Sequence, residues 1–369
     1  MVFISEYTIM SNESGMANGS NENVNSTVAS WMRGVGAFDF LKGWRGAFQG
    51  RAVVLATAGL LVTALWTWIL DRLWKESDAV GMPSLLLDRV DASWDSFFLL
   101  SAVVREQWFY GLCLLIPLAF LWALLGGAIW RMLACKQTET SHPSISRALE
   151  YAIGHYWKGF LLAWALPVGF GLLIGAMVVL YGMFMAIPWL GDLVGGVFFF
   201  IPLALGCLLA FGLLVVLIGG HLFAPGVAVS GSHGTDAVTS AVSYVLSRPI
   251  RAIAYFLTTC LMVWVTSFLL IWLVSLAESV TMTLASFGEG LLSTRGEAGS
   301  DKTSDFLIGF WLGGLHYLAQ GVVTCVFFAG SVVSFLLLRE SVDGTDRCEL
   351  GTVGVGVATT SLVEPVDTP

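Results

Sequence analysis

Six long apolar runs without a charged residue follow one another along the chain. They cover residues 52–70, 108–130, 159–190, 193–220, 252–277 and 306–338. About 20 consecutive apolar residues suffice for a helix to cross the hydrocarbon core of a bilayer. The runs therefore predict an all-α integral membrane protein with about six transmembrane helices. Only Gly191-Asp192 separates the third run from the fourth, which predicts a tight turn there.

A shorter segment with helical periodicity precedes the first, third and fifth runs. Apolar residues recur at i, i+3, i+4, i+7 and i+11, as in Ala37, Phe40, Leu41, Trp44 and Phe48, and again in Ile145, Ala148, Leu149, Ala152 and Tyr156. A third segment runs from Val238 until Pro249 ends it, and Arg51, Lys158 or Arg251 follows each segment. We therefore expect an amphipathic interfacial helix before each pair of spans.

The second and third amphipathic segments, together with the ends of the spans before them, also match at individual residues. Leu125-Gly126-Gly127 and Ile218-Gly219-Gly220 lie 93 positions apart, and the same shift places Tyr151 on Tyr244. Gly344-Thr345-Asp346 echoes Gly234-Thr235-Asp236 at a shift of 110. Because each unit crosses the membrane twice, successive units point the same way. The pattern predicts parallel-repeated helix pairs at about 37–136, 137–229 and 230–347, within a membrane domain of residues 31–347.

The charge distribution predicts the orientation. Basic residues cluster before the first span and between the second and third, whereas the opposite loops are rich in Asp and Glu. Because Lys and Arg concentrate in cytoplasmic loops, we expect both termini and the amphipathic helices on the cytoplasmic side. Residues 1–30, rich in Asn, Ser and Gly, are expected to be a disordered tail, and residues 348–369 a flexible one. A net charge of −8 without a basic cluster argues against binding to nucleic acid.

Candidate chemistry is sparse. His316, Tyr317 and Gln320 fall in the sixth run and could line a polar pocket, although a structural role for His316 is the simpler interpretation. No acidic residue occupies the centre of a run, which disfavours coupled ion transport. The histidines and cysteines show no metal-ligand or nucleophile spacing. We therefore expect no enzyme activity, no metal and no cofactor.

The amphipathic segments are the strongest candidates for a functional role in this sequence. They could simply fix where each span enters the bilayer. Alternatively, they could surround the inner mouth of the protein and contact lipid headgroups or a partner protein, with Arg51, Lys158, Arg248 and Arg251 as the contacting residues. His221, directly after Gly219-Gly220, is expected to bond a carbonyl where the fourth helix ends.

A resemblance adds to this interpretation. Ala224-Pro225-Gly226-Val227, the stretch from Asp236 to Pro249, and Leu336 to Thr345 resemble segments of uncharacterised six-span bacterial membrane proteins, partly from planctomycete-like bacteria. That group is loosely similar to the membrane domain of glycerophosphodiester phosphodiesterases. The resemblance covers roughly residues 120–347 and implies a bacterial inner-membrane protein. No catalytic residue can be transferred, because the chain carries no phosphodiesterase domain.

Two hypotheses for the function follow. The first is a non-catalytic accessory or scaffold subunit of a larger membrane assembly, in contact with membrane lipids and with other membrane subunits or further copies of itself. The second is a channel or carrier for a neutral or amphipathic solute or lipid, because internal repeats often accompany transport folds. A polar cavity at the membrane midplane would favour the carrier, and a solidly packed core would favour the scaffold.

Overall fold

The protein is an all-α integral membrane protein with six candidate membrane spans. The computed structural model describes residues 37–75, 108–138, 143–185, 198–291 and 302–345, and all regular structure in this part is helical. Six helices are long and apolar enough to cross a membrane, which confirms the predicted class. They are α3 (Gly50–Lys75), α6 (Trp108–Gln137), α8 (Leu162–Met185), α9 (Phe200–Ser230), α11 (Pro249–Leu291) and α12 (Lys302–Asp343). The two tails and the predicted turn at 191–192 lie outside the described residues.

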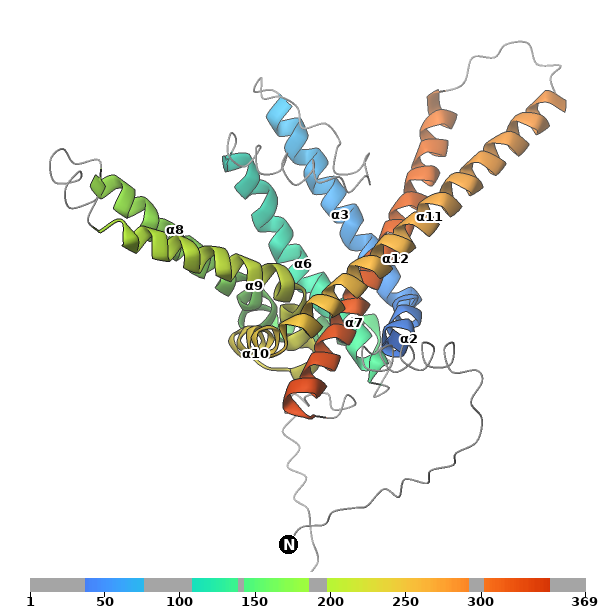
Figure 1. The fold of residues 1–369 in the computed structure, drawn as a ribbon. Coiled ribbons are helices and arrows are strands. Elements are labelled where there is room, and N and C mark those ends of the chain that lie inside the picture. Colours follow the sequence, from blue (N-terminus) through green and yellow to red (C-terminus); the bar gives the residue numbers. More distant parts are fainter. Residues whose placement is uncertain (1–36, 76–107, 139–142, 186–197, 292–301, 346–369) are drawn as a thin grey trace, which may run out of the picture.

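Three short helices precede the three pairs of spans. They are α2 (Ala37–Ala47), α7 (Ile145–Gly154) and α10 (Gly234–Ser247), and all three lie at the same end of the molecule, which we call the base (Figure 1). Their amphipathic pattern is confirmed: in α7, Ala148 and Ala152 are buried, whereas Arg147 and Glu150 are exposed. The element order is thus short, long, long, three times over.

The long helices form three hairpins that radiate from the base and diverge away from it (Figure 1). These are α3 with α6, α8 with α9, and α11 with α12. The first described helix, α2, and the C-terminal end of α12 both lie at the base. The described chain therefore begins and ends at the base.

Contacts among the elements close into a ring. Each short helix packs against the second span of the preceding hairpin: α7 on α6, α10 on α9, and α2 on α12. The spans α6, α9 and α12 also contact one another in every combination. Three parallel units around an axis would produce this cyclic order. The division into repeat units at the predicted boundaries stays a prediction.

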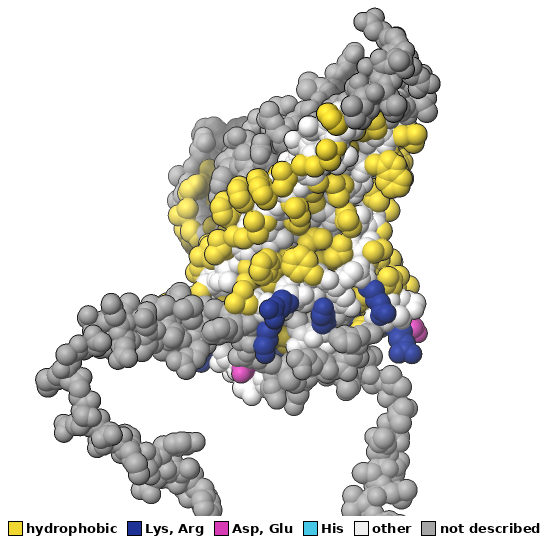
Figure 2. Space-filling view, turned by 90° about the vertical axis from the view of Figure 1, so that its right-hand side faces the viewer, with side chains coloured by type: hydrophobic (Ala, Val, Ile, Leu, Met, Phe, Trp, Pro, Cys, Tyr) yellow, Lys and Arg dark blue, Asp and Glu magenta, His cyan; other side chains and the backbone are white. Residues whose placement is uncertain are grey.

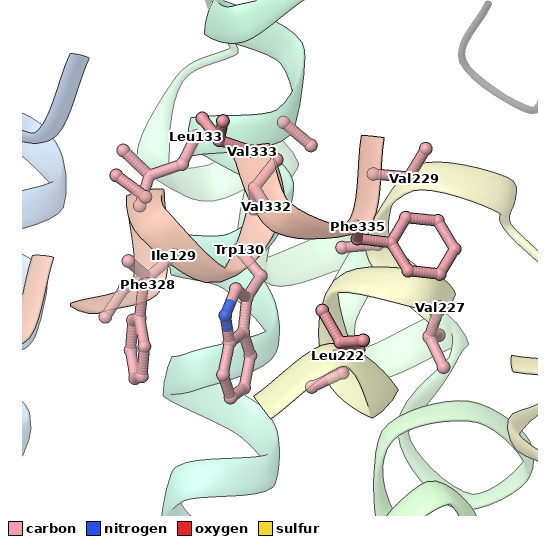
Figure 3. Close-up of a cluster of buried hydrophobic side chains, with 14 of the residues drawn as sticks. Ile129, Trp130, Leu133, Leu222, Val227, Val229, Phe328, Val332, Val333 and Phe335 are labelled. Atoms are coloured by element: carbon pink, nitrogen blue, oxygen red, sulfur yellow. The ribbon is translucent and has the colours of Figure 1, made fainter. Parts of the chain in front are cut away.

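The core lies where the C-terminal halves of α6, α9 and α12 meet. Ile129 and Leu133 of α6, Leu222 of α9, and Val332 of α12 have no exposed surface, and they surround the junction shown in Figure 3. Glycines allow the close approach of neighbouring helices. A Cβ added at Gly127 would lie 2.8 Å from the ring of Phe160. The axis at the base is therefore filled by side chains.

Beyond the base the hairpins separate. In the most apolar 18-residue stretch of α12, 78% of the residues are buried. In the corresponding stretches of α8, α9 and α11, only 11% of the residues are buried. Figure 2 shows the result from one side, a broad belt of hydrophobic side chains with a row of Lys and Arg along its lower edge. Helices α8 and α11 expose these apolar faces because each packs mainly against the other span of its own hairpin, whereas α3 packs more extensively against α12 than against α6.

A neighbouring helix replaces the backbone hydrogen bond that a proline removes from a span. Pro117 of α6 lacks an N–H, so the carbonyl of Cys113 one turn earlier loses its helical donor. The indole N–H of Trp66 in α3 donates to that carbonyl at 3.3 Å. A neighbouring helix thus satisfies the group that the proline leaves free, as expected for membrane helices.

The predicted end of the fourth span at Gly220 is wrong. Helix α9 continues through Pro225 to Ser230 and ends at Gly231, whose φ of 65° is the left-handed conformation typical of a helix terminator. Gly219 serves packing instead, because a Cβ there would lie 3.0 Å from Val245 of α10. Gly344 ends α12 in the same way with a φ of 68°, so its structural counterpart is Gly231 rather than Gly234.

Candidate functional site

The four predicted contact residues all lie at the junctions between short helices and spans, which we call elbows. Arg51 is the second residue of α3, and Lys158 lies in a π-helical turn, η1 (Tyr156–Leu161), that leads into α8. Arg248 separates α10 from α11, and Arg251 is the third residue of α11. All four side chains are exposed, and none forms an ion pair or hydrogen bond with another described residue.

Large apolar side chains accompany these cations. At the shift of 93 positions, Trp157 corresponds to Ile250, and the two are 67% and 82% exposed. Lys158 corresponds to Arg251 at the same shift. In the first elbow, the half-exposed Phe48 precedes Arg51 by three residues. Each elbow therefore presents an exposed apolar group next to a cation.

The π-helical turn explains the geometry of the second elbow. The N–H groups of Gly159 and Phe160 both donate to the carbonyl of His155, at 2.9 and 3.0 Å. Phe160 is fully buried, and the Tyr156 hydroxyl donates to the carbonyl of Phe120 in α6 at 3.1 Å. Trp157, between these two anchored residues, remains on the exposed side with Lys158. Turns of this kind are frequent at functional sites.

A different cation, Arg131, has a structural role that the sequence does not reveal. Its guanidinium lies 4.3 Å from the centre of the Tyr151 ring and donates to the carbonyl of Ala228 at 2.6 Å. The Tyr151 hydroxyl donates to the carbonyl of Val227 at 2.9 Å. Both acceptors belong to the last turn of α9, where the partial negative charge of the helix favours a cation. Burial raises the pKa of Tyr151 to about 12, although Arg131 opposes the shift.

His316 lies far from the elbows, on the diverging part of the third hairpin. Its Nδ1 is 3.2 Å from Oε1 of Glu278 in α11 and 3.0 Å from the carbonyl of Leu312. No hydrogen bond joins the His316 side chain to Tyr317 or Gln320, so the structure pairs it with a residue that sequence analysis did not select. The pocket formed by the three predicted residues stays a prediction.

The register of the hairpin places this pair far from the base. Near the base, the hydroxyls of Thr259 and Ser334 are 3.2 Å apart across the same two helices. Glu278 and His316 lie 19 and 18 residues further along, about 27–29 Å at 1.5 Å per residue. The pairing could have been anticipated from two polar residues at matching heights in an antiparallel hairpin.

The sequence suggested that His221 bonds a carbonyl where the fourth helix ends, but no helix ends there. Because α9 continues to Ser230, the residue lies inside a helix. Its side chain is buried, neither ring nitrogen has a hydrogen bond of good geometry with the described residues, and its ring is 5.2 Å from that of Phe256. The expected helix end is therefore wrong, and the ring packs inside the protein against Phe256.

The described residues contain no group of three or more His, Cys, Asp or Glu side chains that could hold a metal ion. No family model, no curated protein and no solved structure matches the chain. The function must therefore be argued from the arrangement of the chain itself, and the resemblance to six-span bacterial proteins stays a prediction. The elbows are the candidate site with the most distinctive chemistry.

Proposed function

We propose that the protein is a non-catalytic accessory or scaffold subunit of a larger assembly in a bacterial cytoplasmic membrane, with its base toward the cytoplasm. The observation that carries this proposal is the combination of a filled axis at the base with open apolar faces above it. Ile129, Leu222 and Val332 close the axis, while the span windows of α8, α9 and α11 are 11% buried. Such faces can receive the helices of other subunits or of another copy.

The polar groups of the spans support a packing role. Thr258, Thr266 and Ser267 of α11 each donate to the carbonyl four residues earlier, at 2.7–2.8 Å. A hydroxyl that bonds its own helix is less available to a solute. These side chains therefore do not form a continuous polar path along α11.

A carrier for an amphipathic solute or lipid is the second candidate. The separation of the hairpins favours it, because a solute could enter laterally between them, and the half-exposed His316–Glu278 pair would offer it a polar contact. A path along the axis is disfavoured by the fully buried side chains at the base. The two candidates differ in what occupies the space between the hairpins.

Site-specific photo-crosslinking in the native membrane distinguishes them. A crosslinking amino acid replaces Leu213 of α9 or Leu269 of α11, which are 61% and 48% exposed, and the fully buried Val332 serves as the control position. The scaffold proposal predicts one discrete protein adduct, present in stoichiometric amount, at the exposed positions and none at Val332. Adducts with lipid alone would contradict the scaffold and favour the carrier.

A further inference from the structure

We propose that each of the three elbows binds the headgroup of one anionic phospholipid, so that one chain holds up to three such lipids around its base. This inference concerns a ligand and does not depend on whether the protein is a scaffold or a carrier. It rests on the charge, the apolar neighbours and the position of the elbows.

The cations of the elbows have no ionic partner among the described residues. Among the described residues, Arg51, Lys158, Arg248 and Arg251 are exposed and form no ion pair, and the single ion pair found there is the one between His316 and Glu278. Cations at a membrane surface attract the negative phosphates of the lipid leaflet. A phosphodiester group also supplies the acceptors that a guanidinium or ammonium group prefers.

The apolar neighbours indicate a lipid rather than a free anion. Trp157 and Ile250 are 67% and 82% exposed directly beside Lys158 and Arg251, and Phe48 is 52% exposed near Arg51. In water such exposure would be unfavourable, whereas at the boundary between headgroups and acyl chains an apolar side chain and a cation are both satisfied. Figure 2 shows Lys and Arg at this level, along the lower edge of the hydrophobic belt.

The cyclic contacts give the expected number of lipids. Each elbow belongs to a different hairpin, and the short helix of each packs against the second span of the preceding one. The three elbows are therefore distributed around the base rather than gathered at one place. We infer one lipid at each elbow, with the third elbow carrying two cations.

Native mass spectrometry of the full chain tests the inference. The protein is purified in a mild detergent and titrated with phosphatidylglycerol or, separately, with zwitterionic phosphatidylcholine. The expected result is a series that saturates at three phosphatidylglycerol molecules, with much weaker binding of phosphatidylcholine. Lys158→Gln should bind two lipids strongly, with the third about fivefold weaker, the effect expected for one cation near an anionic surface.

Matched variants separate this site from general electrostatics. Arg147 is an exposed cation of α7 whose neighbours in the chain are Ser146 and the buried Ala148, so Arg51→Gln should weaken the binding of one lipid about fivefold and Arg147→Gln should weaken none. Lys158→Arg should retain all three. Equal weakening in Arg51→Gln and Arg147→Gln, or an unchanged affinity for the third lipid in Lys158→Gln, would overturn the proposal. Displacement by an equal concentration of inorganic phosphate would show that a free anion is the ligand and would also overturn it.

Discussion

Adding one methyl group at Gly321 of α12 should destabilise the protein, whereas the same change at Gly314 should not. A Cβ at Gly321 would lie 3.1 Å from the backbone nitrogen and 3.3 Å from the Cα of Thr57 in α3, so the helix backbone itself would have to move. No atom lies within 4 Å of the corresponding position at Gly314. The two substitutions therefore differ only in what the new methyl group meets.

The expected magnitude follows from two opposing effects. Overpacking a tight core costs about 1–3 kcal/mol. Replacing glycine by alanine inside a helix returns up to about 1 kcal/mol through helix propensity. Because both residues lie in α12, the propensity gain cancels in the comparison. The free energy of unfolding of Gly321→Ala should therefore be about 1–3 kcal/mol below that of Gly314→Ala.

Equilibrium unfolding in mixed micelles, followed by tryptophan fluorescence, measures this difference. Gly314→Ala should be as stable as the original protein or slightly more stable. If Gly321→Ala proves as stable as Gly314→Ala, then α3 and α12 do not approach each other closely near the base, and the reasoning about the core is refuted.

Three further predictions concern the polar groups of the structure. Tyr151→Phe should lower the stability by about 0.5–1.5 kcal/mol through loss of the hydrogen bond to α9. Because the folded protein raises the pKa of Tyr151 from 10 to about 12, its neutral form is stabilised, and this contribution should be lost between about pH 10 and 12. Spectrophotometric titration of tyrosinate should show one late-titrating group that the variant lacks. Trp66→Phe should cost about 1–3 kcal/mol in unfolding assays, and less in a Pro117→Ala background, where the helix supplies its own donor. An equal cost in both backgrounds would disprove that coupling. His316→Leu should change the stability by less than about 1 kcal/mol, because the ion pair is half-exposed. Unchanged assembly and unchanged solute uptake in this variant would remove His316 from any functional role.

The spans could be predicted because a long charge-free run has few alternatives to a membrane helix. Their ends could not be predicted as well. Glu278 ends the fifth apolar run, yet α11 continues to Leu291, and the carboxylate pairs with His316 on the neighbouring helix. A sequence window records the charge but not its partner. The same limit applies to Gly219, whose role in close packing with Val245 depends on a helix that follows later in the chain.

The short helices could be predicted more fully than the overall shape. Helical periodicity indicated which residues of α7 face the core, and it left Lys158 outside that stripe, where the structure shows it exposed. The divergence of the hairpins, by contrast, depends on how whole helices pack against one another. Periodicity within α8 cannot reveal it, because this helix is apolar on all sides.

The central claim is that the three hairpins join at the base and separate beyond it. Pulsed electron paramagnetic resonance in lipid nanodiscs tests it with two pairs of spin labels on α8 and α11. The inner pair replaces Trp164 and Leu257, and the outer pair replaces Leu180 and Leu276, all exposed positions. The structure predicts that the outer distance clearly exceeds the inner one, because the hairpins diverge away from the base. Equal inner and outer distances would show a closed bundle and contradict the account.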